Sequence, residues 1–180
     1  MSDGTLMPPV NDERDHIQGP PSAPVTLVEY GDYQCSYCGM AYPIVKSLQR
    51  ALADQLRFVF RNFPLRDSHP NAEHAAEAAE SAAAQGSFWE MHDTLYENQE
   101  QLDDSDLVAY AKELGLDPAQ LARDLEDGTY AARVREDFRS GVRSGVNGTP
   151  TFFVNGVRYD EGWNDPDQFL RALQSVAAST

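Results

Sequence analysis

The two cysteines of the chain, Cys35 and Cys38, are separated by two residues in a Cys-Ser-Tyr-Cys motif. The motif follows a short apolar run and precedes a helical pattern, so we expect Cys35 at the N-terminus of a helix. Backbone N–H groups and the helix dipole at such a position favour a thiolate, which is the nucleophilic form of cysteine. Cys38, one turn later, would be more buried and placed to attack a mixed disulfide formed by Cys35. The spacing therefore predicts thiol–disulfide exchange.

A carboxylate, Glu29, lies six residues before the first cysteine, inside the apolar run 25–30. Burying a carboxylate costs free energy unless the group has a partner or a task. Glu29 would lie near the start of the helix, where it could move the proton of Cys38 during exchange. The alternative is an acid on an edge strand that points into solvent.

The elements around the motif form the pattern strand, motif, helix, strand. Residues 25–30 are apolar and β-branched, which predicts a buried strand. Apolar residues at helical spacing follow in 41–53, and 56–63 alternates as a second strand. The length of this unit suits a parallel βαβ crossover.

Residues from about 66 to 144 have a helical pattern. The segment 71–85 is rich in alanine and is closed by Gly86, and Asp117-Pro118 has the form of a helix N-cap followed by proline. We therefore predict a block of four or five helices inserted between the two halves of a sheet.

The C-terminal part predicts two strands and a helix. Residues 151–154 and 157–159 are separated by Asn155-Gly156, a strong hairpin signal, and Asp165-Pro166 begins a final helix. At the other end, residues 1–14 are polar and proline-containing. We expect 1–14 to be a disordered or loosely attached tail and 15–180 to form one domain.

Several segments of the chain resemble the DsbA-like branch of the thioredoxin-fold superfamily. The resemblance implies an α/β thioredoxin fold, βαβ followed by ββα, with the helical insertion between the halves. It also implies a protein-disulfide oxidoreductase. The likeness covers about residues 15–177 and is carried by Glu29–Cys38, Gly148–Phe153, His69–Ala72, Gln85–Phe88 with Trp89, and Asp15–Ile17 with Gly19.

The resemblance also implies roles for individual residues. Cys35 would be the attacking thiol, Cys38 the resolving thiol and Glu29 the buried acid. Pro150 would be a cis-proline that faces the cysteine pair. The backbone of Thr149 would then pair with an extended substrate strand.

The aromatic residues around the motif have two interpretations. Tyr33 and Tyr37 either line a substrate groove or pack at the rim of the motif. The dipeptide Ser36-Tyr37 departs from the proline that relatives often carry after the first cysteine, so the sequence leaves the direction of the reaction open.

The resemblance implies protein or peptide thiols and disulfides as substrates, no cofactor, and a separate redox partner that restores the starting state. Two other functions stay open. One is a redox-switched peptide-binding or sensor module. The other is a glutathione-conjugate or isomerase-type member of the same fold, against which the presence of both cysteines argues.

Composition excludes several classes of partner. The chain has 180 residues with 14 Lys and Arg against 29 Asp and Glu, a net charge of −15. Such a surface repels phosphates, so we expect neither nucleic acid nor an anionic membrane as a partner. The first residues lack the features of an export signal, which predicts a cytoplasmic protein, with a monomer as the default.

A metal site is not expected from the histidines. His69, His74 and His92 show no recognisable ligand spacing with the two cysteines. We expect His69 in a turn and His92 in helix packing.

Overall fold

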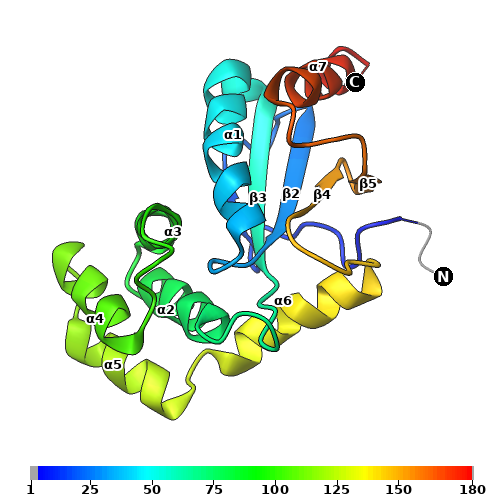
Figure 1. The fold of residues 1–180 in the computed structure, drawn as a ribbon. Helices are drawn as coiled ribbons and strands as arrows, with labels where there is room; N and C mark the ends of the chain where they lie inside the picture. Colours follow the sequence, from blue (N-terminus) through cyan, green and yellow to red (C-terminus); the bar gives the residue numbers. More distant parts are fainter. Residues whose placement is uncertain (1–3, 180) are drawn as a thin grey trace. The chain divides into compact units, whose positions relative to one another are not determined.

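The computed structural model describes residues 4–179. Within that range a five-stranded sheet has the order β1-β3-β2-β4-β5 (Figure 1). The strands are β1 His16–Gln18, β2 Val25–Gly31, β3 Leu56–Asn62, β4 Thr151–Val154 and β5 Val157–Tyr159. The helices are α1 Ser36–Leu52, α2 Ala72–Ala84, α3 Phe88–Glu97, α4 Asp104–Glu113, α5 Pro118–Asp127, α6 Ala131–Arg143 and α7 Pro166–Ala178, with a short 3-10 turn at Ala53–Gln55.

The chain divides into two compact units. Of the described residues, the first unit contains those within Met1–Gly31, Met40–Arg61 and Ser140–Thr180. The second contains Asp32–Gly39 and Asn62–Arg139. The cysteine motif therefore belongs to the same unit as most of the helical segment. The sequence pattern instead places the motif between two strands of the sheet.

The first unit is built on the central strands of the sheet. β2 has β3 and β4 as its neighbours, and the pair β2–β4 is antiparallel with Val28 opposite Phe153. Asn155-Gly156 connects β4 to β5 as the hairpin signal predicted, with Asn155 and Gly156 both at positive φ. The strand β1 was not expected, because three residues carry too short a pattern to detect.

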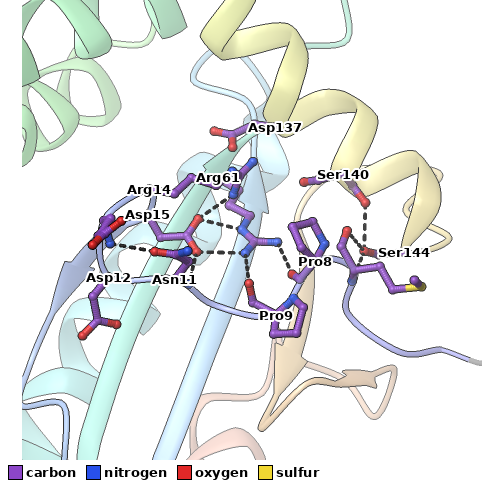
Figure 2. A network of polar contacts seen from close by, with 12 residues as sticks. Pro8, Pro9, Asn11, Asp12, Arg14, Asp15, Arg61, Asp137, Ser140 and Ser144 are labelled. Atoms are coloured by element: carbon purple, nitrogen blue, oxygen red, sulfur yellow. Dashed lines mark hydrogen bonds and ion pairs between the residues drawn. The ribbon is translucent and has the colours of Figure 1, made fainter.

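The N-terminal segment is held by a buried cation, which Figure 2 shows. Arg61 on β3 donates to the carbonyl oxygens of Pro8 and Pro9 at 3.0 and 3.2 Å, and it forms a buried ion pair with Asp15. Leu6 is buried as well. The expectation of a loose tail is therefore wrong for residues 4–14, because their backbone and apolar groups have partners within this unit. Residues 1–3 of the expected tail and residue 180 of the expected domain lie outside the described residues.

The second unit gathers helices around α2 (Figure 1). The alanine-rich α2 contacts α3, α4 and α5, and its small side chains allow close approach. α5 begins as predicted, with Asp117 accepting from the backbone N–H of Gln120 and Pro118 in the first helical position. α5 ends at Gly128, whose φ of 62° is the left-handed conformation that glycine adopts most easily.

Candidate functional site

The cysteine motif lies where the chain enters α1. α1 begins at Ser36, so Cys35 directly precedes the first helical residue, as the sequence predicted. Its carbonyl oxygen accepts the backbone N–H of Gly39 at 3.0 Å, which closes the first turn of the helix. Cys35 and Cys38 are both buried. The helix N-terminus therefore places partial positive charge beside Cys35, where it favours a thiolate.

A buried aspartate, Asp32, connects the motif to the loop before α2. Its Oδ1 accepts the backbone N–H of Gln34 at 2.8 Å. Its Oδ2 accepts the backbone N–H of Leu65 at 2.8 Å and lies 2.7 Å from Nδ1 of His69. Its own backbone N–H donates to Sγ of Cys38 at 3.5 Å. The sequence pattern does not single out Asp32, although an aspartate that accepts from the N–H two residues later is a common turn signal.

A glutamine, Gln99, holds the backbone of the motif from the segment after α3. Its Nε2 donates to the carbonyl oxygens of Tyr33 and Cys35, both at 2.9 Å. A Cβ atom at Gly39 would overlap the Gln99 amide, so the glycine leaves room for this contact. The sequence offered no signal for Gln99, because 64 residues separate it from Cys35.

The two tyrosines of the predicted site differ in their surroundings. Tyr33 is 1% exposed, and its hydroxyl lies 3.0 Å from Nδ1 of His92. Its ring also contacts the ring of Tyr96. Tyr33 therefore packs inside the helical unit rather than lining an open groove. Tyr37 is 61% exposed, and its part in substrate binding stays a prediction.

Glu29, Thr149 and Pro150 belong to the first unit. Glu29 is buried in the central strand β2, opposite Phe152 of β4, which excludes the alternative of a solvent-facing acid on an edge strand. The Thr149–Pro150 peptide bond is cis. The roles of these three residues toward the cysteines stay predictions.

The remaining histidines have protein partners. His74 Nδ1 lies 2.6 Å from Asp104, and this hydrogen bond raises the pKa of His74. Within residues 4–179 no three His, Cys, Asp or Glu side chains are grouped so as to hold a metal ion. No described helix is long and apolar enough to cross a membrane.

Comparison with known proteins shows similarity over nearly the whole chain. A family model described as thioredoxin matches residues 11–175. The Na+/H+ antiporter NhaA 1 of Salinispora arenicola is 50% identical over 174 residues, which cover 97% of this chain and 26% of that protein. The chain thus spans about a quarter of the length of the curated relatives it matches.

Two solved structures extend the comparison. The crystal structure of oxidised BdbD from Bacillus subtilis has a TM-score of 0.86 at 26% identity and covers 98% of each chain. A thioredoxin-like oxidoreductase from Silicibacter pomeroyi has a TM-score of 0.79 at 29% identity, covering 94% of this chain and 95% of that one. These matches confirm the predicted α/β fold.

Proposed function

Because the chain belongs to the thioredoxin family, and within it is DsbA-like, we propose that it is a thiol–disulfide oxidoreductase that uses Cys35 and Cys38. The observation that carries the proposal is the placement of the two buried thiols. Cys35 directly precedes α1, and Cys38 accepts a backbone N–H one turn later. The similarity to a structure described as a thioredoxin-like oxidoreductase supports the same chemistry.

The reaction proceeds through a mixed disulfide. The Cys35 thiolate attacks one sulfur of a substrate disulfide, so that a bond between Cys35 and the substrate forms while the substrate S–S bond breaks and releases one thiolate. Cys38 loses its proton and attacks the Cys35 sulfur, which breaks the mixed disulfide and releases the second substrate thiolate. The substrate gains two electrons and leaves as two thiolates, which take up protons from solvent, and the Cys35–Cys38 pair becomes a disulfide. The same steps in reverse oxidise a substrate dithiol.

The buried acid and the segment before β4 complete the proposed machinery. Glu29 accepts the proton of Cys38, which is a task that would justify a buried carboxylate in β2. The backbone of Thr149, before the cis-proline Pro150, pairs with an extended substrate segment, and Tyr37 offers an exposed aromatic surface. The substrates are protein or peptide thiols and disulfides, and a separate thiol–disulfide partner restores the starting state. The cytoplasmic location and the monomeric state stay predictions, which cell fractionation and size-exclusion chromatography would test.

The proposal is tested by turnover of the cysteine variants. We expect Cys35→Ala to abolish the reduction of insulin disulfides with dithiothreitol as the reductant. Cys38→Ala should accumulate mixed disulfides with the substrate, because the resolving thiol is gone. Far-UV circular dichroism would show that both variants keep the fold. Full activity in Cys35→Ala would overturn the proposal.

A redox-switched binding or sensor module is the second candidate. The observation that favours it is the 50% identity to a segment that makes up 26% of a protein named as an Na+/H+ antiporter. In such a protein, oxidation or reduction of the Cys35–Cys38 pair would change how this module binds a neighbouring part of the protein. The module would not turn over many substrates. The two candidates differ in turnover, because a sensor changes once per chain with no catalytic acceleration, whereas an oxidoreductase cycles many times.

A further inference from the structure

Asp32 contacts both cysteines through its backbone. Its carbonyl oxygen accepts the N–H of Cys35 at 3.1 Å, and its N–H donates to Sγ of Cys38 at 3.5 Å. A change in the position of Asp32 would therefore also shift Cys35 and Cys38. All of these atoms belong to the second unit.

The Asp32 carboxylate is buried and has three donors. Two are the backbone N–H groups of Gln34 and Leu65, which carry no net charge. The third is Nδ1 of His69, at 2.7 Å. The side chain of His69 is 24% exposed, whereas that of Asp32 is 0% exposed. His69 is thus the only side-chain donor among these three, and it reaches solvent.

The charged side chains that flank His69 are engaged elsewhere or exposed. Arg66, in the same loop, pairs with Glu73 of α2 at 3.3 Å. Asp67 is exposed to solvent. Among the described contacts, the side chain that meets the buried Asp32 carboxylate is therefore that of His69.

We infer that Asp32 and His69 form a positioning pair that sets the thiol–disulfide equilibrium of Cys35 and Cys38. A buried negative charge beside the motif disfavours a second negative charge on a thiolate. The hydrogen bond from His69 holds the Asp32 charge away from the motif and so makes the thiolate, and with it the reduced form, more stable. The inference rests on the proposed function, because it assigns a role within the same site.

Two variants change the charge balance in opposite directions. His69→Asn removes the imidazole ring and its 2.7 Å contact, so the buried carboxylate loses its side-chain partner. Asp32→Asn removes the negative charge itself. His74→Asn is the matched control, because His74 forms a similar pair with Asp104 on α4.

The measurement is the equilibrium constant for reduction of the Cys35–Cys38 disulfide in glutathione buffers. His69→Asn should lower this constant by about threefold to tenfold. Asp32→Asn should raise it by about tenfold, equivalent to about 30 mV for two electrons. His74→Asn should leave it unchanged.

The signs of these changes decide the outcome. Changes in the same direction for both variants, or no change in His69→Asn, would overturn the inference. If Asp32→Asn does not fold, the difference between His69→Asn and His74→Asn decides alone. Wild-type protein that catalyses no turnover would refute the proposed function, whereas wild-type turnover with unaltered constants in the variants would refute only this inference.

Discussion

Each of the two units buries an aspartate, and the two carboxylates are neutralised in different ways. In the first unit Asp15 receives two hydrogen bonds from the guanidinium of Arg61, both at 2.9 Å, and both side chains are fully buried. Arginine stays charged at every pH at which the protein is folded. In the second unit Asp32 accepts two backbone N–H groups and lies 2.7 Å from Nδ1 of His69, whose side chain is partly exposed.

The permanent cation makes Asp15 a structural anchor. Burial raises the pKa of Asp15, but the hydrogen bonds and the charge of Arg61 outweigh burial and hold that pKa below its usual range. Arg61 also donates to the hydroxyl of Tyr30 at 2.9 Å and to the backbone of the N-terminal segment. A permanent charge pair suits a part of the molecule that must not change. The carboxylate beside the cysteine motif is held instead by two backbone N–H groups and a histidine.

The largest effect on stability is expected for Asp15→Asn. The substitution leaves the Arg61 charge buried without its carboxylate, and breaking a buried pair costs about 3 to 5 kcal/mol. Urea denaturation followed by circular dichroism measures this loss. The matched control is Asp12→Asn, since Asp12 pairs with Arg57 but is itself exposed. The control should lose about 1 kcal/mol or less.

The same pair predicts a pH dependence with a definite sign. Because the pKa of Asp15 is lowered in the folded state, its contribution to stability is present above the unfolded value of about 3.9 and is lost as the pH falls through the folded value. The stability of wild-type protein should therefore fall more steeply than that of Asp15→Asn below about pH 4. Equal slopes for the two proteins would contradict the role given to Asp15.

Local patterns predicted most of the elements and the two cysteines. The apolar run of β2, the cysteine spacing, the cap at Asp117 and the hairpin at Asn155-Gly156 are signals within a few residues, so a sequence shows them directly. The burial of Glu29 also follows from the apolar character of its strand.

Contacts between distant residues could not be predicted in this way. Asp15 and Arg61 are 46 positions apart, and Asp32 and His69 are 37 apart. No periodicity connects such residues, since only the folded topology brings them together. The polar, proline-containing segment 4–14 was misjudged for the same reason, because its main partner, Arg61, lies on β3.

A second test concerns the neutral donors that hold the motif. Gly39→Ala would displace the Gln99 amide and break its hydrogen bonds to the carbonyls of Tyr33 and Cys35. Two lost hydrogen bonds cost about 1 to 3 kcal/mol, while alanine gains about 1 kcal/mol in a helix, so a net loss of about 1 kcal/mol is expected.

The double variant Gly39→Ala/Gln99→Ala shows whether displacement of Gln99 causes the loss of stability in Gly39→Ala. In a Gln99→Ala background nothing remains to be displaced, so Gly39→Ala should become stabilising by about 0.5 to 1 kcal/mol. The four free energies of unfolding come from thermal or urea denaturation of the single and double variants. The same loss in both backgrounds would show that Gln99 does not hold the motif.

The smallest effect is expected for the exposed histidine pair of the second unit. The hydrogen bond to Asp104 raises the pKa of His74, with burial acting in the opposite direction. A raised pKa stabilises the folded state below the unfolded value of about 6.5, and this stability is lost as the pH rises through the folded value. The side chains of His74 and Asp104 are 45% and 62% exposed, so solvent screening limits the contribution. His74→Asn should therefore lose about 0.5 kcal/mol or less at about pH 5 and nothing at about pH 8, measured by urea denaturation.

Salt distinguishes this exposed pair from the buried one. About 1 M salt shortens the Debye length to about 3 Å and should remove most of the effect of His74→Asn. The loss in Asp15→Asn should persist under the same conditions, because buried pairs are screened much less. If the two losses responded equally to salt, burial would not be what separates the Asp15–Arg61 pair from the His74–Asp104 pair.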